Sequence, residues 1–193
     1  MAVSADPPLV FRSRRNARDP DTVWTLGPDA LESAESSGPA RKMAYGEVKE
    51  LRLLYDPDRA APNRFRCDLN SVAGHRVTLM SKRFVAPGIH EDHASGYAPF
   101  IRELIQRVGG AAPHCKFHAG QTPWSFYGGH ALAVLGVLIL AHLAARLGGL
   151  PPNAALILKV VMAGAYLAVA LTSAKRRRPR RFMPGDIPAD MLP

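Results

Sequence analysis

Two apolar stretches decide the fold: GGHALAVLGVLILAHLAARL at residues 128–147 and AALILKVVMAGAYLAVALTSA at residues 154–174. No charged residue stands between Lys116 and Arg146, and Lys159 is the one charged residue in the second stretch. An α-helix of about 20 residues rises about 30 Å, which is the thickness of the hydrocarbon layer of a bilayer. The two stretches therefore predict two transmembrane helices.

A short turn, GGLPPN at residues 148–153, joins the two stretches. Its Gly, Pro and Asn residues end one helix and let the next begin, so the helices are antiparallel and both ends of the chain lie on one side. Lys and Arg beside a span stay in the cytoplasm. Only Arg146 lies near the turn, whereas the basic residues after the second stretch are Lys175, Arg176, Arg177, Arg178, Arg180 and Arg181. We therefore predict that both ends of the chain are cytoplasmic.

The net charge of +9 is unevenly distributed. Residues 1–127 contain 17 Lys and Arg and 14 Asp and Glu, whereas residues 174–193 contain six and two. A basic tail beside an apolar segment sets membrane orientation, so the charge does not predict nucleic-acid binding. Cys67 and Cys115 form no CxxC pair, which fits a reducing compartment, and the N-terminus lacks the apolar core of a secretory signal.

Some residues within the apolar stretches have alternative interpretations. Lys159 lies about five residues inside the second stretch, where its amine can reach the interface. The alternative is a charge in an ion pathway or a partner contact. His130 and His142 lie near the ends of the first stretch and are interpreted as interfacial. Gly164 and Ala168 have the spacing of small residues that pack closely against the first helix or a partner helix.

Seven short segments between Leu9 and Met80 have the composition of strands and are separated by turn residues. Polar and apolar residues alternate strictly at residues 64–69, so Phe65, Cys67 and Leu69 share one face. The other segments are 9–11, 22–26, 30–36, 41–45, 48–55 and 77–80. Short strands at regular spacing favour a small β-barrel or sandwich.

A helical period follows these strands. Apolar residues at helical spacing are Tyr97, Phe100, Ile101, Leu104, Ile105 and Val108. They predict one face of an amphipathic helix of about 14 residues, ended by Gly109 and Gly110. Packed over the open end of the barrel, the helix would bury this stripe. The predicted fold class is α+β: a seven-stranded β-barrel or sandwich capped by one helix, followed by a transmembrane α-helical hairpin.

Three segments carry a resemblance: WTLGPDAL at 24–31, YGEVKEL at 45–51 and the helix around Tyr97 and Phe100. Together they resemble the bacterial pleckstrin-homology-like (PH-like) domain, here residues 9–110. The whole layout, with IPADMLP at its C-terminus, also resembles two-span membrane proteins of bacteria. The resemblance implies a PH-like fold at the inner membrane, and it implies no established activity.

A basic cluster lies near the first predicted hairpin and consists of Arg12, Arg14, Arg15 and Arg18. PH domains that bind phosphoinositides use basic residues in this region, because several cations can grip a phosphate cluster. The alternative is a solvated basic face that meets anionic headgroups without specificity. In an anchored protein such a face would orient the domain at about 1 kcal/mol per basic residue.

Candidate metal ligands and catalytic motifs are sparse. His90 and His93 are three residues apart, whereas the HExxH motif places its histidines four apart. His114 and His118 have helical spacing with Cys115 beside them, but Pro113 disfavours a helix there. The sequence has no GxSxG, Walker A, GxGxxG or CxxCH motif. We therefore expect no metal, no cofactor and no enzymatic activity.

These observations predict a non-enzymatic, membrane-anchored interaction protein of the bacterial inner membrane, whose PH-like domain binds a protein or anionic lipid headgroups. The alternative is an accessory or assembly subunit of a larger membrane complex, with Lys159, Gly164 and Ala168 as its contact face. A membrane enzyme would need a convergent His–Cys site. The predicted parts are a flexible N-terminus (1–8), the PH-like domain (9–110), a linker (111–127), the spans 128–147 and 154–174, and a basic, Pro-rich tail (175–193) that is either disordered or docked.

Overall fold

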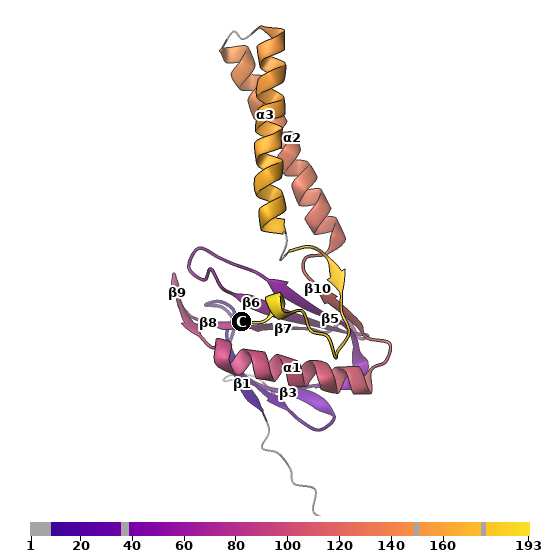
Figure 1. The fold of residues 1–193 in the computed structure, drawn as a ribbon. Coiled ribbons are helices and arrows are strands. Elements are labelled where there is room, and N and C mark those ends of the chain that lie inside the picture. The colour runs from indigo at the N-terminus through magenta and orange to yellow at the C-terminus, as the bar shows by residue number, and fades with distance from the viewer. Residues whose placement is uncertain (1–8, 36–38, 149–150, 175–176) are drawn as a thin grey trace, which may run out of the picture. The chain divides into compact units, whose positions relative to one another are not determined.

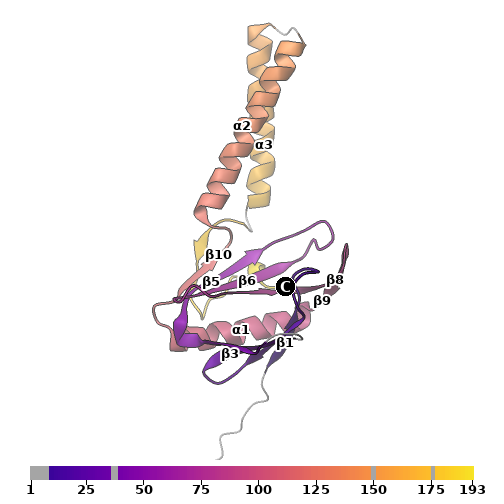
Figure 2. The ribbon, with the colours of Figure 1, turned by 180° about the vertical axis from the view of Figure 1, so that it is seen from behind.

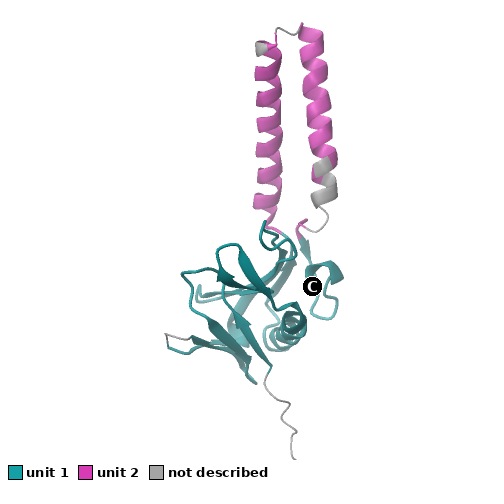
Figure 3. Ribbon diagram, turned by 90° about the vertical axis from the view of Figure 1, so that its left-hand side faces the viewer, with its two compact units in different colours: residues 1–120, 180–193 teal, residues 121–179 magenta. Residues whose placement is uncertain are grey.

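The computed structural model describes residues 9–35, 39–148, 151–174 and 177–193. The chain divides into two compact units, which Figure 3 colours separately. Residues 1–120 and 180–193 form one unit, here called the β domain. Residues 121–179 form the other, here called the helical unit. The basic residues Lys175 and Arg176 lie outside the described residues.

The first four strands of the β domain form an antiparallel sheet in the order β1-β2-β3-β4. Their bounds are β1 (Val10–Ser13), β2 (Thr22–Leu26), β3 (Ala30–Glu35) and β4 (Arg41–Ala44). Alternating residues such as Phe11, Leu26 and Leu31 are buried, as expected for strands with one face on a core. A short 3-10 helix, η1 (Tyr45–Glu47), makes the corner into the next sheet.

The second sheet has five strands in the order β11-β10-β5-β6-β7. Their bounds are β5 (Val48–Tyr55), β6 (Phe65–Ser71), β7 (Arg76–Met80), β10 (Lys116–Ala119) and β11 (Arg180–Arg181). Strands β5, β6 and β7 form an antiparallel meander, β10 runs parallel to β5, and β11 runs antiparallel to β10. A separate hairpin consists of β8 (Lys82–Ala86) and β9 (Ile89–Asp92).

Each of the seven expected strands has a counterpart among β1 to β7, but the predicted number is wrong. The described residues contain eleven strands. Strand β8 begins with two cations and β9 is mostly polar or charged, and β10 and β11 are too short to show a period. The described ladders form three separate sheets and do not close into one barrel.

Helix α1 (Ala94–Ala111) lies across the opening between the two large sheets (Figures 1 and 2). All six residues of the predicted apolar stripe are fully buried, which confirms that the stripe faces the core. The Phe11 ring of β1 lies 5.4 Å from the Phe100 ring and 5.7 Å from the Tyr97 ring, measured between centroids. The helix continues past the predicted stop at Gly109 and Gly110.

The C-terminal residues 180–193 belong to the β domain and are docked on it. Met191, in the 3-10 helix η2 (Ala189–Met191), is fully buried, and Leu192 is buried beside the same core. Pro184 lies against α1, where Gln106 Nε2 donates a hydrogen bond of 3.0 Å to its carbonyl oxygen. A Cβ atom at Gly109 would stand 2.7 Å from Cγ of Pro184, so the glycine makes room for the tail.

The helical unit consists of α2 (Pro123–Leu147) and α3 (Pro152–Ala174), which run side by side (Figures 1 and 2). Helix α2 begins five residues before the predicted span, because Thr122 caps it and Pro123 occupies its first turn. Among the described residues, one helix (Pro123–Arg146) is long and apolar enough to cross a membrane, and a shorter apolar helix covers Pro152–Ala168.

The predicted domain boundaries differ from the structure at the junctions between the two units. The expected linker, residues 111–127, contains β10 and the first turn of α2. The expected free tail instead supplies β11 and part of the core. The helical unit is therefore an insertion into the β domain rather than a C-terminal extension of it.

Candidate anion-binding groove

A groove of about 850 Å³ opens between the inner face of the first sheet and the strand β7. Three segments that are far apart in the sequence meet there: the β1–β2 loop, the β4 end of the first sheet, and the β6–β7 turn with β7. Gly74 makes that turn with a φ of 84°, a conformation that favours glycine. The lining consists of Gly74 with Ser13, Arg15, Asp19, Pro20, Thr22, Trp24, Leu31, Ser33, Glu35, Arg41, Lys42, Met43, Glu47, His75, Arg76, Val77 and Thr78.

The floor of the groove is apolar with a few polar groups. Trp24, Leu31 and Met43 line it, and all three pack against the hydrophobic core. The indole Nε1 of Trp24 is buried and has no hydrogen-bond partner among the described residues. The hydroxyl of Ser33, which is buried beside it, reaches only the Arg41 carbonyl oxygen at 3.5 Å.

Four cations surround the groove, and each has a carboxylate partner. Arg15 lies 2.8 Å from Asp19, Arg41 lies 3.6 Å from Glu35, Lys42 lies 3.1 Å from Glu32, and Arg76 lies 2.7 Å from Asp68. The four cationic side chains are between 52% and 74% exposed. Exposed ion pairs contribute about 0–1 kcal/mol, so a bound anion can share or replace the partners of Arg15, Arg41 and Lys42 at little cost.

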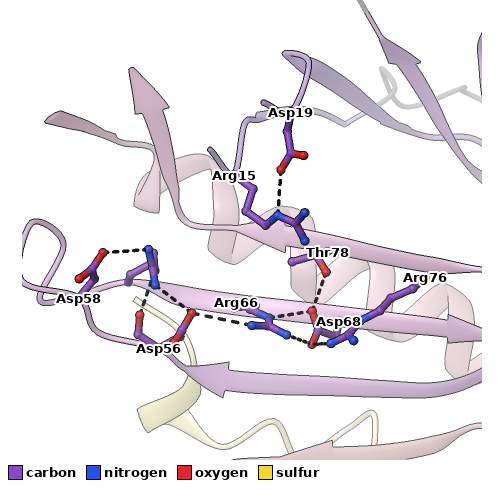
Figure 4. A network of polar contacts seen from close by, with 9 residues as sticks. Arg15, Asp19, Asp56, Asp58, Arg66, Asp68, Arg76 and Thr78 are labelled. Carbon is purple, nitrogen blue, oxygen red and sulfur yellow. Dashed lines mark hydrogen bonds and ion pairs between the residues drawn. The ribbon is translucent and has the colours of Figure 1, made fainter. Parts of the chain in front are cut away.

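A buried carboxylate positions the cation on β7 (Figure 4). The side chain of Asp68 is 4% exposed and accepts hydrogen bonds from Arg66, Arg76 and Thr78, the last two at 2.7 and 2.8 Å. Burial alone raises the pKa of the Asp68 carboxyl, but the three donors outweigh burial and hold that pKa below its usual value. Asp68 is therefore charged at neutral pH and fixes the guanidinium of Arg76 beside the groove.

The basic cluster predicted from the sequence is divided by the structure. Arg15 lines the groove. Arg14 donates hydrogen bonds to the carbonyl oxygens of Asp19 and Ala17, so its guanidinium holds the β1–β2 loop together. Arg12 and Arg18 are exposed and do not line the groove.

Sequence reasoning missed Arg41, Lys42 and Arg76 as members of the site. Single Lys and Arg residues are ordinary on the exposed faces of strands, and no local sequence pattern distinguishes these three from others. They are recognisable as one cluster only when the order of the strands is known. The β1–β2 segment was found because its four arginines are close together in the sequence.

The candidate residues His114, Cys115 and His118 do not form a metal site among the described residues, where no group of three or more His, Cys, Asp or Glu could hold an ion. His118 lies on β10 and His114 in the turn before it, so the two do not share a helix. Burial raises the pKa of the Cys115 thiol to about 11. Burial also raises the pKa of the fully buried Cys67 thiol well above its usual value.

The residues singled out in the apolar stretches lie as follows. Gly164 and Ala168 are exposed on α3, so they do not pack against α2, and a contact with a partner helix stays a prediction. Instead, Ala141 and Ala145 of α2 are buried. His130 Nδ1 and the Tyr166 hydroxyl are 3.2 Å apart, which joins α2 to α3. Lys159 is half-buried.

Of the basic residues that follow α3, Arg177, Arg178, Arg180 and Arg181 are described, and all four are exposed. Arg180 forms an ion pair with Asp190 inside the docked tail. Comparison of the chain with family models, with curated proteins and with solved structures found no match.

Proposed function

We propose that this protein is a membrane-anchored binding protein without enzymatic activity, and that its β domain takes an anionic ligand in the groove. The groove carries the proposal, because it combines four exposed cations with an apolar floor. Ligand sites are typically concave and mostly apolar, with a few polar groups that fix the ligand. The volume of about 850 Å³ lies in the range of such sites.

A PH-like domain is part of this proposal. Four antiparallel strands are followed by a three-stranded meander, β5 to β7, and then by α1. This order supports the resemblance, although β8 and β9 stand between the meander and the helix and two further strands extend the second sheet. The groove adjoins the β1–β2 loop, the region in which phosphoinositide-binding PH domains carry their basic residues.

We also propose that the helical unit crosses the inner membrane twice, with both chain ends in the cytoplasm. Residues before and after the unit belong to one domain with one core, so both ends of the unit must lie on the same side of a membrane. If α2 crosses, α3 has to return. The exposed arginines between α3 and β11, Arg177 and Arg178, support the cytoplasmic side.

The ligand chemistry proposed here is an anion, carried either by a lipid headgroup or by an acidic protein segment. To test it, the full chain is reconstituted in nanodiscs of neutral lipid and titrated with a soluble short-chain anionic phospholipid and with an acidic peptide. We expect at least one probe to bind, and Arg15→Gln to weaken that binding about fivefold, as about 1 kcal/mol per cation implies.

Arg12→Gln is the matched control. It removes one arginine from the same β1–β2 region, but Arg12 does not line the groove. We expect this variant to bind like the unmodified protein. Equal weakening by both variants would show that only the general charge matters, and failure of every anionic probe to bind would refute the proposal.

A further inference from the structure

The strand β7 has a free edge that faces the groove. Among the described strands, β6 is the only neighbour of β7. The N–H of Ser71 donates to the carbonyl oxygen of His75 at 2.8 Å, and the N–H of Ser81 donates to Phe65 at 2.9 Å. In an antiparallel ladder, every second residue of a strand forms hydrogen bonds with the neighbouring strand. The N–H and C=O groups of residues 75, 77, 79 and 81 therefore point toward β6. The N–H and C=O groups of Arg76 and Thr78 therefore point away from β6.

Residues from both faces of β7 line the same groove. Val77 belongs to the inner face, together with its partner Leu69, whereas Arg76 and Thr78 belong to the outer face, where they contact Asp68. Successive residues of a strand point to opposite faces. A hollow lined by residues of both faces passes the edge of the strand, where the free backbone groups of Arg76 and Thr78 lie.

We propose that the groove binds an extended acidic polypeptide segment, which adds to the edge of β7 as a further strand. This inference rests on the proposed function and names the carrier of the anion. A free strand edge presents donors and acceptors alternately, and only another backbone satisfies both. The phosphate of a lipid headgroup offers acceptors, and these would leave the carbonyl oxygens of Arg76 and Thr78 unpaired.

The walls of the groove specify the side chains of the segment. One face of an added strand would meet Trp24, Leu31 and Met43, which suit apolar residues. The other face of the added strand would continue the outer face of β7, where the cation Arg76 suits Asp or Glu. Strand residues alternate between faces, so the expected ligand alternates apolar and acidic residues. The five residues of β7 set its length at about six residues.

The test uses the full chain in neutral nanodiscs and a capped peptide of about six alternating glutamate and valine residues. Thr78→Pro removes the edge N–H, and edge strands tolerate proline where the N–H serves no ladder bond. Thr78→Val is its control, because it also loses the hydroxyl bond to Asp68 but keeps the N–H. Because both variants lose the hydroxyl, their difference reports the N–H alone, and we expect Thr78→Pro to bind about tenfold more weakly than Thr78→Val.

A second arm leaves the protein unchanged, so that it does not depend on how Thr78→Pro folds. Two isomeric peptides carry N-methyl groups on alternate residues, one on the odd and one on the even positions. Only one set of N–H groups faces β7, so one isomer should keep its affinity and the other should lose about tenfold. Equal affinity of the two isomers would overturn strand addition.

The remaining outcomes separate this inference from the proposed function. If the short-chain anionic phospholipid binds and the peptide does not, the peptide is the wrong carrier and the anion-binding function stands. If Thr78→Pro and Thr78→Val bind the peptide equally, the edge of β7 is not used. If neither probe binds, both proposals fail.

Discussion

Ala119 of β10 pairs with Arg180 of β11 in an antiparallel ladder, although the whole helical unit separates the two residues in the sequence. The pairing brings the start and the end of the inserted segment together. It continues inward, because Phe182 donates its N–H to the carbonyl oxygen of Phe117 and the two rings lie 5.7 Å apart. The C-terminal residues therefore complete the β domain after the chain has passed through both apolar helices.

Gly109→Ala is expected to loosen the docked tail. Alanine usually stabilises a helix by up to about 1 kcal/mol relative to glycine, but here its Cβ would lie 2.7 and 2.9 Å from side-chain atoms of Pro184. Overpacking of this kind costs about 1–3 kcal/mol. Hydrogen exchange at the Phe182 amide should be faster in this variant. Gly110→Ala, which meets nothing within 4 Å, should leave that exchange rate unchanged or lower it.

Met191→Ala should lower the free energy of unfolding of the β domain by about 2–5 kcal/mol, because the side chain is fully buried in the core. Urea unfolding of the full chain in detergent, followed by Trp24 fluorescence in a Trp124→Phe background, measures the change. Met183 is 76% exposed in the same tail, so Met183→Ala should change stability by less than about 0.5 kcal/mol. Similar effects of the two substitutions would mean that the tail is not part of the core.

The sequence predicts those elements whose signal lies in neighbouring residues. The apolar stripe from Tyr97 to Val108 has a helical period, and Phe65, Cys67 and Leu69 have a strand period, so α1 and β6 are both found, although α1 is longer than predicted. Strand β11 has two residues and pairs with a partner on the far side of the insertion, so no local pattern reveals it. The groove likewise depends on strand order, which places Arg41 and Arg76 around one hollow.

Asp68→Asn should destabilise the β domain by about 1–3 kcal/mol at pH 7, because it leaves the bonds of Arg66 and Arg76 without a charged acceptor. The pKa of Asp68 is lower in the folded protein than in the unfolded chain. The charged carboxylate therefore contributes its full stabilisation above the pKa of the unfolded chain, about 3.9. This stabilisation is lost as the pH falls through the pKa of the folded protein.

The free energy of unfolding of Asp68→Asn should lie below that of the unmodified protein by a constant amount from pH 7 to 5. This gap should narrow below about pH 4. Urea midpoints at several pH values measure it. Asp58→Asn is the control, since Asp58 is 52% exposed and lies 3.6 Å from Arg64. Its effect should stay below about 1 kcal/mol at every pH. If Asp68→Asn is destabilised at pH 2 as much as at pH 7, the charge of Asp68 is not the cause of the destabilisation.

Cys115 should react slowly with maleimides in the folded protein. Burial raises the pKa of its thiol from 9.0 to about 11, which lowers the thiolate fraction at pH 8 about 100-fold, and the thiolate is the reactive form. Mass spectrometry can follow the modification of Cys115 separately from that of Cys67. The rate should rise about tenfold per pH unit up to about pH 10, and urea should abolish the protection. A rate that is already maximal near pH 7 would indicate an activated thiolate beside His114 and His118, and would restore the case for an enzyme.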